Sequence, residues 1–500
     1  MACPWPWRWP QACSGPTRRC PPPGSRPGAA ATAAERALDH AFRLSYEHLD
    51  PDLRLVFRRL ALHPGADADV CSVGALAGVD VGSAERALAA LVRANLVEQH
   101  RPGRFRLHDL LRALAVDLVA RHDGDGARRV AMIRLIDHYV DRTIAAQNAT
   151  SPRKWRRDPA ATTPEFVDET HAYAWLETEC RTIVAVVRRA ADLGAHAQVV
   201  RLALASAESL ARSPGLAAEA SAVLGHALRA ARVDRDRAAV LHRLAILARN
   251  AGDLEAARAH CDRSLELSRA AGDRRGQAFV LDLLGTLDHL EGRDTEALEH
   301  HREALDLARG AGDRACEDDI LHNLGKLCLE RLGDPSGALD YFGQSLEIRR
   351  GLADRRGLVS TLNAMGATYA ALNDPASAGQ SFEEALAVSR DIGDRLSELD
   401  TLANLGRYRA AHGALDAALA EFDRARDIAV ELGDVRRELR LRFDVAGAMH
   451  AAGRLKGAEE HYRSVLDLAV ERDDTAVQEI AYRALGKLYF DLADRQTRSP

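Results

Sequence analysis

The chain lacks the sequence features that most directly indicate a membrane, a metal or a nucleotide. It has no run of about 18 apolar residues, so no segment is predicted to span a membrane. Its eight cysteines form no CxxC pair and no Cys/His cluster of metal-ligand spacing, and we interpret them as reduced cytosolic thiols. No GxxxxGK[ST] phosphate loop occurs, so nothing in the sequence would cradle the phosphates of ATP. We therefore predict a cytoplasmic protein that is not an enzyme, binds no metal and needs no cofactor of its own.

Aromatic residues and net charge are also scarce. Aromatic side chains make up 5% of the 500 residues, whereas alanine, leucine and arginine dominate, a composition that favours long helices packed through small residues. The 68 basic and 73 acidic side chains are interspersed and leave a net charge of −5. No overall field therefore attracts the chain to nucleic acid or to anionic lipid.

What the sequence contains instead is an internal repeat of 40 or 41 residues. Small residues recur at Ala245, Gly285, Gly325, Gly366, Gly406, Ala446 and Gly486, and a second series in phase with them comprises Ala257, Ala297, Ala338, Ala378, Ala418 and Ala458. Turn-forming pairs such as Gly252-Asp253 lie between the two series, where glycine can end one helix and aspartate can cap the next. Each period is thus predicted to be a helical hairpin whose small residues let its two helices approach closely.

This repeat resembles that of the tetratricopeptide family. The family's pattern of Leu-Gly, Tyr, Ala, Phe/Tyr and Ala appears nearly whole in Met365, Gly366, Tyr369, Ala378, Phe382 and Ala385, and again in Leu405, Gly406, Ala418, Phe422 and Ala425. The period is longer than the family's common length of about 34 residues. The resemblance implies an all-α fold class, in which an α-solenoid of tetratricopeptide-type hairpins binds another protein or a peptide.

The first half of the chain is predicted to hold a small winged-helix domain. Helical patterns cover residues 34–47, 51–62, 70–77 and 83–95, and two short strands at 96–99 and 104–107 are joined by a Pro-Gly turn. The predicted domains are a disordered tail over 1–33, the winged helix over 34–122, a linker helix and loop over 123–169, degenerate helical repeats over 170–234, and six tetratricopeptide repeats with a capping helix over 235–495.

The winged-helix segments resemble those of STAND-class signalling ATPases, the NB-ARC regulators that often carry tetratricopeptide sensors. The resemblance lies in LSYEHLDPDLRLVFRRLALHP, ALAALVRANLVE and RFRLHDLLRALA. In that family a Met-His-Asp motif follows the wing, and its histidine touches the β-phosphate of bound ADP. Leu107, His108 and Asp109 occupy the motif here, so the resemblance implies that His108 senses the nucleotide and that Asp109 fixes its environment.

The alternative for these two residues is a plain helix start, in which Asp109 caps the helix and His108 packs against it. Because the phosphate loop is missing, ADP or ATP is expected only in intact relatives. We interpret the chain as a relative that lacks the nucleotide-binding domain.

The candidate peptide-binding residues lie on the inner helices of the central repeats. Polar residues near the Leu-Gly pair are expected to line the concave face, and they are Asp319, His322, Asn323, Lys326, Asn363, Asp400, Asn404 and Arg407. Their amides can hydrogen-bond the backbone of an extended peptide, while Lys326 and Arg407 can meet its carboxylates. The alternative is that a solvated concave face is polar without any ligand.

Basic residues of the winged helix give the alternative function, a DNA-binding transcriptional regulator. Arg86 and Arg93 on the third helix would contact phosphates, but two arginines are few for that purpose. The denser cluster at 153–157 can equally be a solvated linker. The favoured hypothesis is therefore a signalling or transcription-regulatory protein whose solenoid binds a protein or peptide partner, with DNA less favoured.

Two further groups of reactive side chains are expected to be structural. His300 and His301 are predicted to lie on a solvated helix without a third metal ligand. Cys261 and Cys328 fall at hairpin packing positions and are predicted to be core residues rather than nucleophiles.

Overall fold

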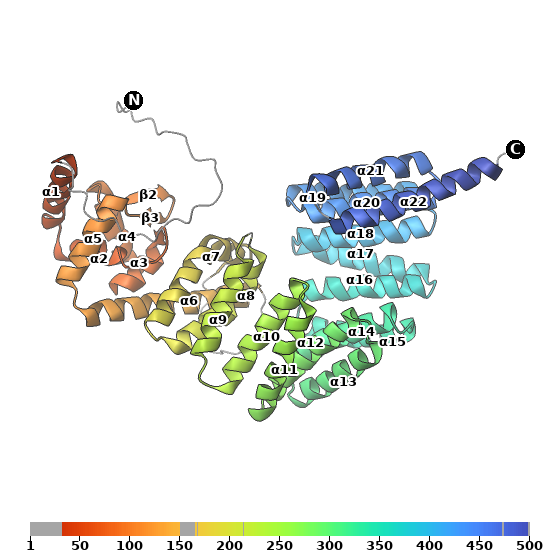
Figure 1. The fold of residues 1–500 in the computed structure, drawn as a ribbon, viewed down its shortest axis with the longest axis horizontal. Coiled ribbons are helices and arrows are strands. Elements are labelled where there is room, and N and C mark those ends of the chain that lie inside the picture. The colour runs from red at the N-terminus through yellow and green to blue at the C-terminus, as the bar shows by residue number, and fades with distance from the viewer. Residues whose placement is uncertain (1–32, 151–165, 168, 214, 473–474, 499–500) are drawn as a thin grey trace. The chain divides into compact units, whose positions relative to one another are not determined.

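The computed structural model describes residues 33–150, 166–167, 169–213, 215–472 and 475–498. Nearly all of the tail predicted to be disordered and the basic cluster at 153–157 lie outside these residues. The chain divides into two compact units, and the boundary falls between Leu135 and Ile136. Each unit is described by itself (Figure 1).

The N-terminal unit combines helices with one small antiparallel sheet. Its helices are α1 (Ala33–Glu47), α2 (Pro51–Leu60), α3 (Val70–Ala77), α4 (Val81–Arg93) and α5 (Asp109–His122). Its strands are β1 (Ala68–Asp69), β2 (Glu98–Arg101) and β3 (Arg104–Arg106). Strand β3 lies between β1 and β2, and both pairings are antiparallel.

The predicted hairpin is present, but its first strand begins two residues later than the sequence suggested. Leu96 and Val97 were expected in that strand, and they instead lie buried beneath the sheet in a core with Phe57, Leu88 and Leu91. Strand β1 was not predicted, because two residues are too few for an alternating pattern to be visible. It pairs Ala68 with Phe105 and so adds a third strand to the hairpin.

The second unit consists of antiparallel helices. Helix α6 (Asp125–Thr150) carries the unit boundary, and α7 (Glu169–Asp192) precedes a hairpin of α8 (His196–Arg212) and α9 (Ala217–Ala230). In the described part of the chain, six hairpins of uniform helix length follow: α10–α11 (Asp234–Asn250, Leu254–Ala270), α12–α13 (Arg274–Leu290, Asp294–Gly310), α14–α15 (Arg314–Glu330, Pro335–Gly351), α16–α17 (Arg355–Ala371, Pro375–Asp391), α18–α19 (Arg395–Ala411, Leu415–Glu431) and α20–α21 (Val435–Ala451, Leu455–Glu471). Helix α22 (Thr475–Arg498) packs on α21. The all-α solenoid predicted from the repeat is therefore confirmed.

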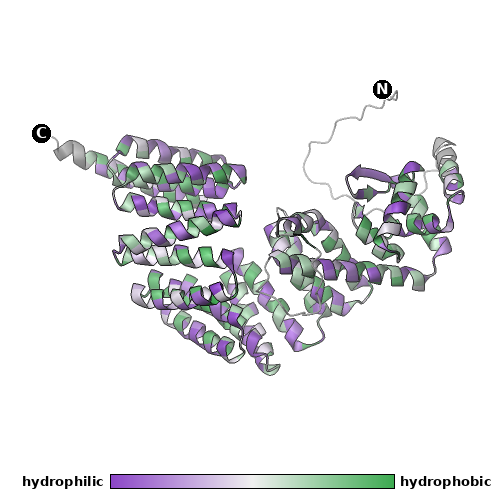
Figure 2. Ribbon diagram, turned by 180° about the vertical axis from the view of Figure 1, so that it is seen from behind, coloured by the Kyte–Doolittle hydropathy of each residue, from purple (hydrophilic) through white to green (hydrophobic). Residues whose placement is uncertain are grey.

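Local sequence fixes the turn of each hairpin. In the first hairpin Gly252 ends α10 at a φ of 83°, which a residue with a Cβ rarely adopts. Asp253 then caps α11 by accepting a hydrogen bond from the Ala256 amide at 3.0 Å. Hydrophilic and hydrophobic residues alternate along the solenoid helices (Figure 2), since each helix buries a stripe against its neighbours.

Four of the predicted small residues, Gly285, Gly325, Gly366 and Gly406, each lie against a ring from the second helix of the same hairpin. A Cβ added at Gly325, Gly366 or Gly406 would lie 2.5, 2.7 or 2.6 Å from a phenylalanine ring of the following helix. These rings belong to a third series in phase with the first two, which comprises Cys261, His301, Phe342, Phe382, Phe422 and Tyr462. All six are buried, and we call them the knob residues. The predicted core position of Cys261 is confirmed, and Cys328 is also buried.

Ion pairs between aspartate caps and arginines join successive hairpins. Asp273 caps α12 and also accepts a hydrogen bond from Arg235 Nε at 3.0 Å, and Arg235 belongs to the preceding first helix. Arg356 and Asp394 repeat this arrangement at 2.6 Å. The same carboxylate therefore begins one helix and holds the previous one, which keeps neighbouring first helices in register.

Candidate functional site

The first helices of the hairpins form the inner face of the solenoid. Helices α10, α12, α14, α16, α18 and α20 contact one another in sequence, whereas the second helices are farther apart from their counterparts. A stack of hairpins curves toward the side on which its helices lie closer together. All eight predicted groove residues lie on α14, α16 or α18 and so belong to helices of this face.

The predicted groove residues differ in how much of their surface solvent reaches. Lys326 and Asp400 are exposed, and the other six are partly buried. Lys326 forms no ion pair with any residue that the structure describes. Asp400 accepts a hydrogen bond from Arg437 Nε at 3.2 Å.

Asn323 is held by a carboxylate that the sequence analysis did not single out. Its Nδ2 donates to both oxygens of Asp282 on α12, at 3.1 and 3.0 Å. Asp282 also accepts from His301 Nδ1 at 2.8 Å. Burial alone would raise the pKa of Asp282, but the hydrogen bond and the charge of His301, together with the Asn323 amide, outweigh burial and lower that pKa. Asp282 precedes Gly285 by three residues, the same offset as His322 from Gly325, so the repeat could have identified it.

The groove amides farther along are also bound to the neighbouring hairpin. Asn363 Nδ2 donates to Thr401 Oγ1 at 2.8 Å, and Thr401 in turn donates to the Ser397 carbonyl at 2.8 Å. Asn363 Oδ1 is buried and accepts no hydrogen bond from the described residues. This acceptor is enclosed by the protein, so a ligand reaches it only if neighbouring side chains move.

Arg407 and Asn404 form the polar contact at the α18–α20 step. Arg407 Nη2 donates to Asn404 Oδ1 at 2.6 Å, and its Nη1 pairs with Asp444 on α20. Burial raises the pKa of Asp444 even though Arg407 acts in the opposite direction. Four of the predicted groove residues, Asn323, Asn363, Asp400 and Arg407, thus form a ladder of polar contacts between neighbouring first helices. Asp282 and Asp444 are members of this ladder that were not predicted.

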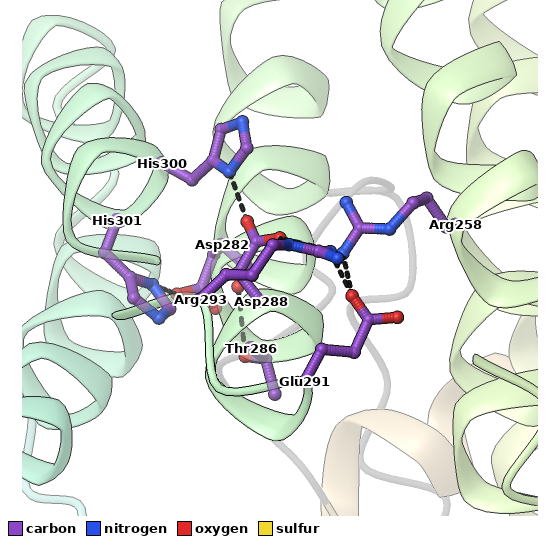
Figure 3. A network of polar contacts seen from close by, with 8 residues as sticks. All are labelled: Arg258, Asp282, Thr286, Asp288, Glu291, Arg293, His300 and His301. Carbon is purple, nitrogen blue, oxygen red and sulfur yellow. Dashed lines mark hydrogen bonds and ion pairs between the residues drawn. The ribbon is translucent and has the colours of Figure 1, made fainter. Parts of the chain in front are cut away.

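The histidine pair on α13 differs from its prediction. The prediction that His301 is solvated is wrong. Its side chain is 2% exposed, because it takes the knob position over Gly285. His300 instead binds Asp288, whose side chain is 1% exposed and also accepts from Arg258 and Arg293 (Figure 3). Burial would raise the pKa of Asp288, but these hydrogen bonds lower it.

These histidines are therefore committed to carboxylates. Within the described residues, no group of three or more His, Cys, Asp or Glu side chains is arranged to hold a metal ion. Among the described helices, none combines the length and the hydropathy that a membrane span needs.

His108 and Asp109 lie at the start of α5. His108 is the N-cap residue, but its side chain makes no capping hydrogen bond, and both side chains are exposed. His108 borders an open hollow of about 420 Å³ beside β2, together with Asn95, Glu98 and Gln99. The lining contains one carboxylate and no lysine or arginine, so it does not suit a diphosphate. The nucleotide-sensing role of His108 and Asp109 stays a prediction.

Arg86, one of the two arginines of the DNA-binding alternative, has a local role. Arg86 Nη2 donates to Ser83 Oγ at 2.9 Å, and Ser83 is bound to the α4 cap Asp80. Arg86 therefore helps to close the first turn of α4, and its side chain is engaged at the helix surface.

Comparisons with known proteins agree with the repeat architecture. Residues 236–310, 288–351 and 357–431 match the tetratricopeptide repeat family. The chain is 32% identical over 249 residues to the regulatory protein AfsR of Streptomyces griseus, covering 48% of this chain and 26% of that protein. It is 30% identical over 167 residues to the regulatory protein AfsR of Streptomyces coelicolor, covering 32% of this chain and 17% of that protein.

One of the solved structures that the chain matches is that of a Signal Transduction ATPase with Numerous Domains (STAND) protein with a tetratricopeptide repeat sensor from Pyrococcus horikoshii. It is 14% identical, with a TM-score of 0.47, and the match covers 91% of this chain and 68% of that one. The chain spans about a quarter or less of the length of the curated relatives. It contains tetratricopeptide repeats, and over up to about half of its length it is similar to regulatory proteins.

Proposed function

We propose that this chain is a cytoplasmic regulatory protein without enzymatic activity, whose solenoid binds a protein or an extended peptide on its inner face. The regulatory class is supported by the similarity to AfsR proteins. Binding is supported by the repeat itself, because stacked hairpins create an extended inner surface that a polypeptide can follow.

One observation supports the central repeats as the binding position. Helix α16 carries small side chains at three of its exposed positions, Ser360, Ala367 and Ala371, and the exposed Arg356 that precedes them is paired with Asp394 of the next hairpin. Their spacing of seven and four residues places them on one side of the helix. Lys326 of α14 occupies the position equivalent to Ala367, one residue after the repeat glycine, and so does Arg407 of α18. The small side chains of α16 leave space for the backbone of a bound peptide, and Lys326 and Arg407 lie on the first helices before and after α16.

The ladder side chains suit such a ligand because they are already fixed. Asn323, Asn363 and Arg407 are each held by a neighbouring helix, so little side-chain freedom is lost when a ligand binds them. Arg407 has five N–H donors, and only part of this capacity is used by Asn404 and Asp444. A peptide carboxylate between Lys326 and Arg407 is the contact that we propose.

A steric substitution tests the position. Peptides are selected from a displayed random library against the full chain, and their affinities are then measured for Ala367→Trp and for Ala387→Trp, an exposed alanine of α17. Ala367→Trp is expected to weaken the selected peptides at least tenfold, whereas Ala387→Trp leaves them unchanged. Equal affinities for both variants would place the binding site elsewhere.

A charge reversal tests the carboxylate contact. Lys326→Glu is compared with Lys456→Glu on α21, because both lysines are exposed and the second lies on an outer helix. Only Lys326→Glu should weaken acidic peptides, and the effect should shrink at high salt, since screened charges interact less.

We further propose that residues 34–122 form a STAND-type winged helix. The order of helix, strand, two helices and hairpin supports this proposal. In intact relatives this domain would couple the solenoid to an ADP/ATP switch. The chain itself is expected to show no heat of binding on titration with ADP, and saturable binding would contradict the proposal. Salt-dependent retention on DNA would favour the alternative, a DNA-binding regulator.

A further inference from the structure

The helices on either side of α16 carry opposite charges at two levels of the inner face. The first level lies six residues before the repeat glycine, and its residues are Asp319 on α14, Ser360 on α16 and Asp400 on α18. The second level lies one residue after that glycine, and its residues are Lys326, Ala367 and Arg407. Each flanking helix therefore has a carboxylate at the first level and a cation at the second, whereas α16 has a small side chain at both.

This charge pattern is confined to the central hairpins. At the equivalent positions, α12 carries Phe279 and Thr286, and α20 carries Arg440 and Gly447. Helix α16 contacts both α14 and α18. The two levels are seven residues apart, which places them on one side of each helix and about 10 Å apart along it. Carboxylates thus border one end of this stretch of α16, which we call the α16 surface, and cations border the other.

Lys326 and Asp400 have the most capacity left for a ligand. Lys326 is exposed and forms no ion pair with the residues that the structure describes. The Asp400 side chain is 51% exposed, and its Oδ1 accepts a hydrogen bond from Arg437 Nε at 3.2 Å. An ion pair as exposed as this one contributes little in water, so a second cation can share the carboxylate. Asp319 and Arg407 are partly buried instead.

Two other exposed charges border the α16 surface. Glu330 lies one turn beyond Lys326, and its Oε2 is 3.4 Å from Nε2 of His289 on α12. Arg356 lies one turn before the first level of α16 and is paired with Asp394 at 2.6 Å. Each of these charges is therefore engaged with a neighbouring hairpin.

We propose that the α16 surface binds an extended peptide in which an acidic and a basic side chain are three residues apart; the proposal rests on the inner-face binding described above. An extended chain advances about 3.4 Å per residue, so three residues span the two levels. Side chains three positions apart point to opposite sides of such a chain. The acidic side chain reaches Lys326 on α14 and the basic one reaches Asp400 on α18, while Ser360 and Ala367 lie beneath the peptide backbone.

Displayed peptide pools test the spacing. Each pool carries one glutamate and one lysine at a fixed separation of one to seven residues, with random uncharged residues elsewhere, and is selected against the full chain. We expect the pool with a separation of three to be enriched most. Equal enrichment of all pools would overturn the proposal. Strongest enrichment at a separation of seven would also overturn it, because a helical ligand needs seven residues to span two turns.

A charge reversal tests the basic contact. A peptide from the enriched pool is compared with the same peptide carrying glutamate in place of its lysine. Their affinities are measured for the unmodified chain, for Asp400→Lys and for Asp467→Lys, which changes an exposed aspartate of the outer helix α21. Asp400→Lys should weaken the lysine peptide roughly tenfold and make the glutamate peptide the tighter ligand, because like charges repel. Asp467→Lys should change neither affinity, and circular dichroism verifies that both variants are folded.

These measurements separate this proposal from the inner-face binding on which it rests. If Ala367→Trp abolishes binding but Asp400→Lys leaves the preference for lysine unchanged, the charge pattern alone is refuted. If Ala367→Trp leaves binding intact, the position on the inner face is refuted, and this proposal with it. A selection that yields no binding peptide would refute both.

Discussion

Replacing Gly366 by alanine tests the packing on which the solenoid depends. The new methyl group would lie 2.7 Å from Cε1, 2.8 Å from Cζ and 2.9 Å from Cδ1 of Phe382. Ordinary contacts between carbon atoms are about 3.5–4.0 Å, so the ring or the helix must move by roughly 1 Å. Phe382 is 2% exposed and is surrounded by Tyr369, Tyr408 and Ala378, which limits that movement.

Gly379 provides a matched control on the other helix of the same hairpin. A Cβ at Gly379 meets no atom within 4 Å. Replacing glycine by alanine inside a helix stabilises it by about 1 kcal/mol in either position. At Gly366 an overpacking cost of about 1–3 kcal/mol opposes this gain. The free energies of unfolding of Gly366→Ala and Gly379→Ala should therefore differ by about 1–3 kcal/mol, with Gly379→Ala the more stable.

Unfolding in urea, followed by circular dichroism, compares the two variants. Because repeat proteins can unfold in parts, hydrogen exchange of α16 and α17 should localise the loss to this hairpin. In a Phe382→Leu background the Gly366→Ala change should lose most of its cost, which gives a coupling energy of the same size. If Gly366→Ala stabilised the chain as much as Gly379→Ala, the notch would have no packing role and the reasoning would fail.

Three other predictions concern stability. Burial and nearby arginines lower the pKa of His63 to about 4, so the unfolded chain binds the proton more readily than the folded chain. About 3 kcal/mol of stability should therefore be present above pH 6.5 and be lost as the pH falls toward 4, and His63→Asn should remove this pH dependence in urea titrations. Asp318→Ala leaves Arg349 buried without its carboxylate, which it contacts at 2.8 Å, and should cost about 3–5 kcal/mol by chemical denaturation, whereas the same change at the less buried Asp319 should cost far less. Ala353→Gly should raise the free energy of unfolding by up to about 1 kcal/mol, because Ala353 has a φ of 52° where other junctions have glycine. A lower free energy of unfolding would refute the strain argument.

The sequence predicted the solenoid well because its information is periodic. Gly366 and Gly406 recur at a fixed distance, and a fixed distance in a repeat corresponds to a fixed depth in the structure. The knob position was visible for Phe382 and Phe422. It was missed for His301, since a histidine on a helix rich in charged residues resembles a solvated side chain. Only the structure shows the ring beneath Gly285, bound to Asp282.

The sequence predicted which helices carry the candidate groove residues, but not the bonds that these residues make. Asn323, Asn363 and Arg407 lie on first helices as expected. Their partners Asp282 and Asp444 are some 40 residues away in the sequence, on adjacent hairpins, and a single sequence gives no sign of which polar pairs meet across that interval. The bounds of β2 were displaced for a related reason, because Leu96 and Val97 satisfy the strand pattern while the core takes them up.

The hydrogen bonds of the inner-face amides lead to different parts of the core in different hairpins. At α16, a ligand that binds Asn363 would replace or accompany the hydrogen bond from Asn363 to Thr401. Within the described part of the chain, Thr401 in turn donates only to the Ser397 carbonyl of its own helix. At α14 a ligand that binds Asn323 acts on Asp282, and Asp282 holds His301, the knob residue of the α12–α13 hairpin. Asn323 and His301 both lower the pKa of Asp282. If a ligand drew Asn323 away, His301 would be the main remaining donor, and the negative charge of Asp282 would be less well stabilised. Because hairpins in a solenoid influence mainly their neighbours, a change in this knob would pass to the adjacent repeats first. If the proposed peptide lies near α14, its binding would therefore alter hairpin packing, whereas binding at α16 would change only the contact between helices.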